Sequence, residues 1–400
     1  MKGPDLTRDL GFFSSRSRMS DSSAFAYLTP MPELNSKRIT AVDALRGWTV
    51  IGMILVNVPG RWGEQFAILE HAEWHGVTFA DLIFPFFLFV VGISIVLAYN
   101  GAKESGAPAA AIIRKVALRG LRLFALGVAL HLLFTIGKWG DGIRIVGVLQ
   151  RIALVFVACV ALFFTTNRKQ QLYIGGGILI GYWVLLMFVP VPGVGVGVLE
   201  PGANFTAWID QYIVPGKMYQ GTWDPEGFFS TFPAIASGIC GMMIGYIIIS
   251  DRSVEQKLIR IFFAGVVMYF LGAFWDLFFP ANKHIWTSSF VLWTCGLGSL
   301  TLAAMWWIID VQGYAKWSFP GIVFGKNAIF AYVVHDLLLF PLVFLKVTGD
   351  GQSINSLLFT GMKSIGLAPP VASLLWSLLY IWLCYLPTYY LYKKGRFLKI

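Results

Sequence analysis

The side chains best suited to proton transfer gather in one polar segment, residues 57–81, which joins two long apolar runs. A histidine such as His71 can take a proton from an attacking group near neutral pH. Asn57 could offer an amide donor to a developing oxyanion. Asp81, where the second run begins, could cap that helix and orient an imidazole. We interpret the three as a candidate catalytic set; a loop histidine with an ordinary hydrogen bond and a simple helix cap are the alternatives.

Two further polar residues, Gln150 and Arg151, lie in the sequence RIVGVLQR near the start of the run 143–165. We expect them about two turns inside a membrane helix, which is roughly 10 Å at 1.5 Å per residue. An arginine at that depth is too costly to leave without a partner. We therefore expect it to face a water-filled cavity or an anion.

A third polar pair, Asn327 and His335, lies in the apolar run 319–346. Residues 327, 331 and 335 would share one face of a single helix, because their spacing is four. Asp336 would point elsewhere or pair with a neighbouring helix. The pattern favours a cavity wall, and an interhelical hydrogen bond is the alternative.

The sequence TWDPEGFFST, at the end of the long polar segment 191–226, combines an aromatic ring with two carboxylates. Trp223 could stack on a sugar ring, while Asp224 and Glu226 could bind hydroxyl groups or an ammonium group. The alternative is a turn followed by the N-cap of the next helix.

Composition places these residues in a membrane. Of 400 residues, 57% are hydrophobic and 13% are charged, whereas soluble domains carry about 25% charged residues. Apolar runs of about 20 residues recur, each long enough to span a bilayer. We predict an all-α polytopic protein with ten spans, at residues 41–58, 79–99, 116–136, 143–165, 172–190, 227–249, 258–279, 286–310, 319–346 and 370–392.

The chain has a net charge of +10, and most of its Lys and Arg residues lie in the loops on one side of this ten-span arrangement. Such a bias is what the positive-inside rule produces, so we expect cytosolic termini and no nucleic-acid partner. The loops 59–78 and 191–226 then face outward from a transmembrane domain of residues 39–400. We interpret residues 1–38 as a disordered cytosolic tail, and residues 353–366 as an interfacial or re-entrant helix. The four cysteines lie inside apolar runs without metal-ligand spacing, so no metal is expected.

Five stretches of the sequence belong together: DALRGWTVIGMILVNVPG, HAEWHGVTFADLIFPFFLFVVG, RIVGVLQR, WDPEGFFSTFPAI and GKNAIFAYVVHD. In combination they resemble the heparan-α-glucosaminide N-acetyltransferase family, and its bacterial NagX-type members in particular. That resemblance implies a membrane-embedded enzyme that takes acetyl groups from cytosolic acetyl-CoA and delivers them to the amino group of a glucosamine-type sugar on the far side. It also implies a bacterial inner membrane and permits a homodimer.

Carried over motif by motif, His71 matches the catalytic histidine of the family, Asn57 its VN motif and Asp81 its ADL-I-FP motif. We expect the cofactor to contact Gln150, Arg151, Asn327, His335, Arg46 and Lys326. The large lumenal domain of the lysosomal relatives has no visible counterpart, which favours a small amino sugar as acceptor. Direct transfer and an acetyl-histidine intermediate both stay open.

A transporter of amino sugars is the alternative function. Arg151, His335 and Asp336 would then be substrate or proton sites within the membrane. Two features disfavour it: no repeated halves are visible in the sequence, and the polar set gathers at one outer loop rather than at the membrane midplane.

Overall fold

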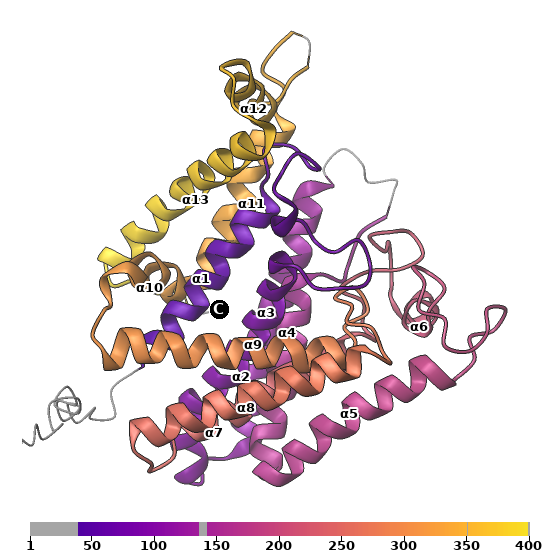
Figure 1. Cartoon of the computed structure of the whole chain (residues 1–400), viewed down its shortest axis with the longest axis vertical. Helices are drawn as coiled ribbons and strands as arrows, with labels where there is room; N and C mark the ends of the chain where they lie inside the picture. The colour runs from indigo at the N-terminus through magenta and orange to yellow at the C-terminus, as the bar shows by residue number, and fades with distance from the viewer. Residues whose placement is uncertain (1–38, 136–141, 350, 399–400) are drawn as a thin grey trace, which may run out of the picture. The chain divides into compact units, whose positions relative to one another are not determined.

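The computed structural model describes residues 39–135, 142–349 and 351–398; the expected tail, residues 1–38, lies outside them. The described chain consists of helices and connecting segments, with isolated β-bridges such as the one between Arg144 and Gly216. The all-α fold predicted from composition is therefore confirmed. Figure 1 shows helices α1, α10, α11 and α13 grouped together and helices α2, α3, α4, α7, α8 and α9 packed beside them.

The helices follow the apolar runs closely. Their bounds are α1 (Thr40–Asn57), α2 (Phe79–Glu104), α3 (Ala109–Phe134), α4 (Val148–Thr165), α5 (Arg168–Phe188), α6 (Phe205–Ile213), α7 (Thr231–Ile248), α8 (Val254–Asp276), α9 (Ser288–Trp306), α10 (Phe319–Lys326), α11 (Ala328–Phe344), α12 (Ile354–Ser364) and α13 (Pro369–Lys393). Short 3-10 turns lie at η1 (Ala67–Leu69) and η4 (Lys316–Ser318), and a π-helical turn, η3 (Trp307–Val311), extends α9.

Eight described helices are long and apolar enough to cross a membrane, and a ninth span results if the bent pair α10 and α11 counts as one. The chain is thus a polytopic helical membrane protein with eight or nine candidate spans where ten were expected. The difference lies in the run 41–58. This run does form a helix, α1, but Asp43, Arg46 and Asn57 leave it without an apolar stretch of the length and hydropathy that the eight spans have.

The predicted single helix over residues 319–346 is wrong, because the chain bends there by 80°. Asn327 lies at the bend with φ −127° and ψ 37°, outside the helical region. Its side-chain oxygen accepts a hydrogen bond from the backbone N–H of Leu398 at 3.2 Å. This hydrogen bond holds the C-terminal segment against the junction of α10 and α11.

Helix α1 is held firmly at its start and along its length. Asp310, which the π-helical turn η3 carries, accepts hydrogen bonds from the backbone N–H groups of Thr40 and Ala41, each at 2.9 Å. Farther along, Gly47 lies so close to α10 that a Cβ atom there would stand 1.6 Å from the carbonyl oxygen of Gly321. Close backbone approach at small residues is a common way to pack membrane helices.

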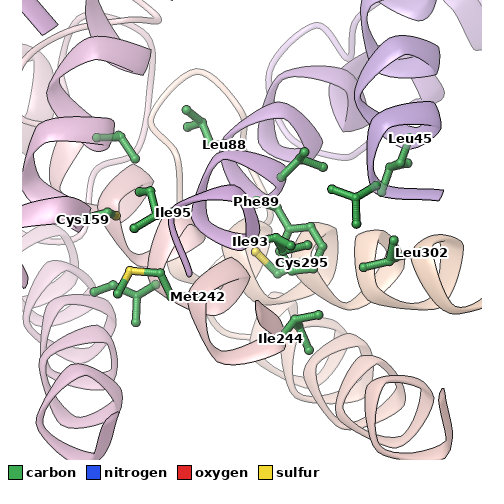
Figure 2. Packing of buried hydrophobic residues seen from close by; sticks show 14 of the residues in the cluster. Leu45, Leu88, Phe89, Ile93, Ile95, Cys159, Met242, Ile244, Cys295 and Leu302 are labelled. Atoms are coloured by element: carbon green, nitrogen blue, oxygen red, sulfur yellow. The ribbon is translucent and has the colours of Figure 1, made fainter. Parts of the chain in front are cut away.

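The core beneath the site joins α2 to α7 and α9. Phe89 and Ile93 of α2 are fully buried, and Figure 2 shows them beside Cys295 of α9, while Met242 of α7 lies near Ile95 and Cys159 in the same cluster. Inside a bilayer such contacts act through close packing, since lipid tails are as apolar as the side chains. Because α2 is packed along this length, the residues at its N-terminus have a fixed position.

Two short helices outside the main bundle support the loops 59–78 and 191–226. The expected loop 191–226 contains a short helix, α6, whose N-cap Asn204 accepts a hydrogen bond from Ala207 N–H at 2.9 Å. The segment 353–366 forms the short helix α12, and its Phe359 is fully buried beneath Gly60. Asn355 on the same helix donates to the Gly60 carbonyl at 3.2 Å. Helix α12 thus supports the start of the segment that carries His71.

Candidate active site

A cavity of about 630 Å³ lies between α1 and α2. Its lining extends on α1 from Arg46 to Asn57 and on α2 from Ala80 to Tyr99. At 1.5 Å per residue these stretches are about 16 Å and about 28 Å long. A hydrocarbon core is about 30 Å thick, so the cavity extends along most of a membrane-spanning helix.

The two ends of this cavity differ in chemistry. Asn57, His71, Lys283 and Glu226 line what we call the His71 end; Arg46, Arg119 and Lys326 line what we call the basic end. Between them the wall is mostly apolar, with side chains such as Val50, Met53 and Phe87.

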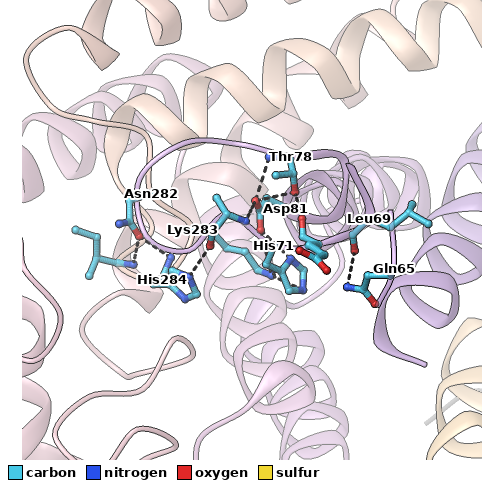
Figure 3. A network of polar contacts seen from close by, with 11 residues as sticks. Gln65, Leu69, His71, Thr78, Asp81, Asn282, Lys283 and His284 are labelled. Carbon is cyan, nitrogen blue, oxygen red and sulfur yellow. Dashed lines mark hydrogen bonds and ion pairs between the residues drawn. The ribbon is translucent and has the colours of Figure 1, made fainter. Parts of the chain in front are cut away.

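His71 and Asp81 form the most directed contact at the His71 end. The imidazole Nδ1 lies 2.8 Å from Asp81 Oδ1, and the two side chains are 30% and 1% exposed. The other carboxylate oxygen, Oδ2, accepts from the backbone N–H of Ala72 at 3.0 Å and of Thr78 at 3.1 Å. Figure 3 shows this network at the start of α2.

The surroundings of Asp81 determine which ring nitrogen of His71 carries the proton. Two backbone N–H donors, from Ala72 and Thr78, meet Asp81 Oδ2, as expected for a carboxylate. Asp81 also lies in the first turn of α2, where the helix dipole favours a negative charge. A carboxylate only accepts hydrogen bonds. Nδ1–H is therefore the donor to Asp81, and the lone pair of the neutral ring lies on Nε2.

Lys283 completes this group, and the sequence interpretation missed it. Its Nζ lies 3.0 Å from Nδ1 and 3.2 Å from Nε2 of His71, and 3.6 Å from Asp81 Oδ1. Burial lowers the pKa of Lys283, while Asp81 and Glu226 act against that change. One sequence signal could have pointed to it: a lysine flanked by asparagine and histidine between two apolar runs, on the same predicted side as His71.

The carboxylates of the 191–226 segment have two different positions. Asp224 is 3% exposed and binds Arg144 through two contacts, of 2.7 Å and 2.6 Å. Glu226 lies 2.5 Å from the same guanidinium and also lines the cavity. Burial raises the pKa of Glu226, but Arg144, Arg151 and Lys283 outweigh it and hold that pKa below its ordinary value. Asp224 therefore anchors the segment, and Glu226 is the carboxylate that reaches the cavity.

Trp223 belongs to an aromatic cluster beside His71 rather than to the cavity lining. Trp74 stacks on His284 with ring centroids 5.3 Å apart, and Trp223 meets both rings edge-on at 5.0 Å and 5.3 Å. The pKa of His284 is lowered by burial and by the neighbouring Lys283. These rings link three segments that are distant in sequence and support the His71 loop.

Gln150 and Arg151 lie beside the cavity but outside its lining. Both are buried, and the Arg151 guanidinium donates to the Gly227 carbonyl at 3.1 Å and to the Ser230 hydroxyl. The predicted depth of two turns is wrong, because α4 begins at Val148. The residues just before α4 are not helical and contact the 191–226 segment, with Lys217 N–H donating to the Ile143 carbonyl at 2.9 Å.

Asn327 and His335 also lie outside the cavity lining. Asn327 is the N-cap of α11, and its carbonyl accepts from Ala331 N–H at 2.9 Å, while His335 lies farther along the same helix. The bend therefore separates both residues from α10 and not from each other. Asn327 binds the C-terminal segment as described above, and His335 Nδ1 lies 2.9 Å from Asp336 Oδ1. Asp336, which was expected to point elsewhere or to pair with a neighbouring helix, instead contacts His335 on its own helix. The His335 carbonyl accepts from the Tyr380 hydroxyl at 2.5 Å, which ties α11 to α13.

The basic end is built from helices. Arg46 of α1 donates to Asp43 at 3.1 Å and to Ser94 on α2 at 2.6 Å. Lys326 at the end of α10 places its ammonium 5.1 Å from the centre of the Tyr392 ring. Arg119 of α3 lies 5.7 Å from the Phe156 ring centre. Three cations from three helices thus line this cavity.

Comparisons with known proteins agree with the motifs. A model of the family described as "Heparan-alpha-glucosaminide N-acetyltransferase, catalytic" matches residues 38–279. The heparan-alpha-glucosaminide N-acetyltransferase of Mus musculus is 27% identical over 92% of this chain and 61% of its own length. The protein of the same name from Homo sapiens is 28% identical over 91% of this chain and 60% of its own length.

The chain spans about three fifths of these relatives, and the part matched by the family model includes Asn57, His71 and Glu226 of the His71 end. Within the described residues, no three histidine, cysteine or acidic side chains form a group that could hold a metal ion. The family match covers more than half of the sequence. The chain therefore belongs to the heparan-alpha-glucosaminide N-acetyltransferase catalytic family.

Proposed function

We propose that the chain transfers an acetyl group from acetyl-CoA, which enters at the basic end of the cavity, to the amino group of a glucosamine-type sugar at the His71 end. The observation that carries the proposal is the continuity of the cavity. It joins three cations to a histidine whose Nδ1 is held by a buried carboxylate. Phosphate groups suit the first end, and a proton-accepting imidazole suits the second.

The cavity also fits the shape of the donor. Acetyl-CoA carries its phosphates at one end and its thioester at the end of a long, thin arm. The apolar wall formed by residues such as Val50 and Met53 suits that arm. Arg46, Arg119 and Lys326 would bind the phosphates. The name of the two relatives, an N-acetyltransferase, is consistent with such a donor.

The transfer itself requires one base. The acceptor nitrogen attacks the thioester carbonyl carbon, so a C–N bond forms while the carbonyl electron pair moves onto oxygen. The tetrahedral intermediate then collapses, and the C–S bond breaks. His71 Nε2 accepts the proton from the attacking nitrogen and passes it to the departing sulfur. Asp81 holds the imidazole in the tautomer that this step needs. The products are the N-acetylated amine and CoA.

Glu226 and Asn57 are the other polar residues that line the His71 end. Glu226 would bind the hydroxyl or ammonium groups of the acceptor, and Asn57 would donate to the carbonyl oxygen. The basic end would face the cytosol. In support, the start of α1 and the end of the described chain both lie at that end, where Leu398 lines the cavity with Arg46. The positive-inside rule gives the same orientation.

The test is acetyl transfer by the purified protein in detergent and in liposomes, with labelled acetyl-CoA and glucosamine. We expect release of CoA that depends on the acceptor. His71→Ala should lower the turnover number by at least about 10³-fold. Its binding of acetyl-CoA should change less than about threefold, since the base lies at the other end of the cavity from the phosphates.

The matched control is His75→Ala, which removes a neighbouring imidazole that lies outside the cavity lining. It should retain transfer within about threefold. Normal turnover by His71→Ala would show that His71 is not the base. Uptake of N-acetylglucosamine into liposomes, without acetyl-CoA binding or CoA release, would replace the proposal with the transporter.

A further inference from the structure

The turn that carries Lys283 is fixed by hydrogen bonds on both sides. Asn282 Oδ1 accepts from the backbone N–H groups of His284 at 2.8 Å and Ile285 at 3.1 Å. Asn282 N–H donates to the Thr287 hydroxyl at 2.9 Å. The Ala281 carbonyl accepts from Gly76 N–H at 2.8 Å, which joins the turn to the His71 loop. Figure 3 shows Asn282, Lys283 and His284 beside His71.

The same turn contains an unusual backbone conformation. Trp286 has φ +52° and is the one non-glycine residue with positive φ in the described chain. Its ring is fully buried, and its indole N–H donates to Ser237 at 3.2 Å. Such conformations are unfavourable for a bulky residue and persist where the surrounding structure enforces them, often at functional sites. The turn is therefore built to hold one geometry, and Lys283 is its side chain that lines the cavity.

The position of the Lys283 ammonium follows from its distances. At 3.0 Å and 3.2 Å it is almost equally far from both ring nitrogens of His71. A point equally far from both nitrogens cannot lie along the N–H or lone-pair direction of either one. The separation of 3.6 Å from Asp81 Oδ1 is longer than a hydrogen bond. Asp81 therefore attracts Lys283 mainly through its charge, and the ammonium, which has three N–H donors, can donate toward the cavity.

We propose that Lys283 is a second catalytic residue, whose ammonium stabilises the negative charge that develops on the thioester oxygen during transfer. The inference rests on the proposed function and concerns the same site. A carbonyl carbon attacked by a nitrogen that is hydrogen-bonded to His71 Nε2 lies within reach of the Lys283 Nζ. Its oxygen receives the electron pair of the C=O bond and gives it back when the C–S bond breaks. Lys283 keeps its proton throughout, whereas His71 carries the moving proton.

This role differs from a structural ion pair with Asp81 in what it predicts. A fixed donor acts where charge appears in the transition state, so its loss lowers the turnover number more than it weakens binding of the ground state. An ion pair that only supports Asp81 would act through the position of His71. Its loss would not be repaired by a small cation that diffuses into the cavity.

The experiment compares Lys283→Met, Lys283→Arg and Lys283→Ala in the labelled acetyl-CoA assay, with Lys217→Met as control. Lys217 is an exposed lysine of the 191–226 segment outside the cavity lining. We expect Lys283→Met to lower the turnover number by about 10²-fold, the loss typical of one oxyanion donor. Its dissociation constant for acetyl-CoA should stay within about threefold of the wild-type value. Lys283→Arg should recover part of the loss, and Lys217→Met should match the wild type.

Lys283→Ala supplies a readout that a structural role would not produce. Added methylammonium or ethylammonium should restore part of its turnover in a saturable manner, whereas His71→Ala in the same buffer should not respond. Wild-type turnover in Lys283→Met, or a Lys283→Ala enzyme that binds acetyl-CoA normally and is not rescued by either amine, overturns the proposal. If the wild-type chain itself transfers no acetyl group, the proposed function fails first, and the two failures are thereby distinguished.

Discussion

The two ends of the cavity are built in different ways. At the His71 end, His71, Lys283 and Glu226 come from connecting segments that are bonded to one another and largely buried. At the basic end, Arg46 and Lys326 extend from helices and are half-buried. The first arrangement fixes directions between atoms, and the second gathers positive charge. Substitutions at the His71 end should therefore change turnover, and those at the basic end should change binding of the donor.

The largest effect should come from Asp81→Asn. An amide has one accepting and one donating side, whereas Asp81 accepts on both. If the amide oxygen keeps the donors from Ala72 and Thr78, its NH₂ group points at His71 Nδ1 and moves the ring proton to Nε2. The base is then in the wrong tautomer. We expect the turnover number to fall by about 10³-fold or more, measured as acetyl transfer at saturating acetyl-CoA.

Glu73→Gln is the matched control for this substitution. It removes an exposed carboxylate from the same loop, and we expect transfer within about twofold of the wild type. Binding of acetyl-CoA by Asp81→Asn should remain within about threefold, which shows that the cavity is intact. A fall in binding as large as the fall in turnover would mean that Asp81 supports the fold of the loop rather than the tautomer of His71.

The second prediction concerns stability of the segments around the His71 end. Asp210 of α6 is 1% exposed, and burial raises its pKa from 3.8 to about 6. Between these values the folded chain holds a proton that the unfolded chain releases, so stability falls as pH rises from about 4 to about 6. Above pH 6 the full cost is present, on the order of 3 kcal/mol at 1.36 kcal/mol per pKa unit.

Asp210→Asn removes this charge without changing the shape of the side chain. We expect a higher midpoint of thermal unfolding than the wild type at pH 7.5, and a smaller difference at pH 4.5. Asp251→Asn, at an exposed position, should differ little from the wild type at either pH. A gain from Asp210→Asn that is equal at both pH values would contradict the ionisation argument.

The sequence predicted most of the helices because apolar runs determine where a chain can cross a bilayer. The predicted span 79–99 and the observed α2, Phe79–Glu104, begin at the same residue. The bend at Asn327 was missed, since an apolar run has the same pattern whether it is straight or broken. The short helix α6 was missed because it is stabilised by the segment around it, with Asp210 accepting from Phe229 N–H at 2.9 Å.

The site was predictable only where its residues are near in sequence. His71 and Asp81 are ten residues apart, and both lie at a boundary between a polar loop and an apolar run. Lys283 is 212 residues from His71 and meets it only through the packing of α2 against α9 and the turn before α9. Arg151 was predicted to face a cavity because a charged side chain inside a membrane costs free energy. Gly227 and Ser230 accept from Arg151 Nη2 and meet part of that cost, while Nε and Nη1 are buried without a hydrogen-bond partner in the described chain. The argument therefore located a buried arginine without locating the cavity.

The smallest effect should come from the basic end, through Lys326→Gln. Lys326 lines the cavity, and its ammonium also lies 5.1 Å from the Tyr392 ring centre. We expect the KM for acetyl-CoA to rise by about three- to tenfold with the turnover number unchanged, because the charge contributes to binding in ground state and transition state alike. The exposed Lys316→Gln, next to the same helix but outside the cavity lining, should leave both constants unchanged. Acetyl-CoA that lacks the 3′-phosphate identifies the group bound: if Lys326 binds that phosphate, the wild type and Lys326→Gln should have the same KM for this donor. A lower turnover number in Lys326→Gln at saturating donor would show that the two ends are not separate in function, since a phosphate-binding cation would then be acting on the chemistry at His71.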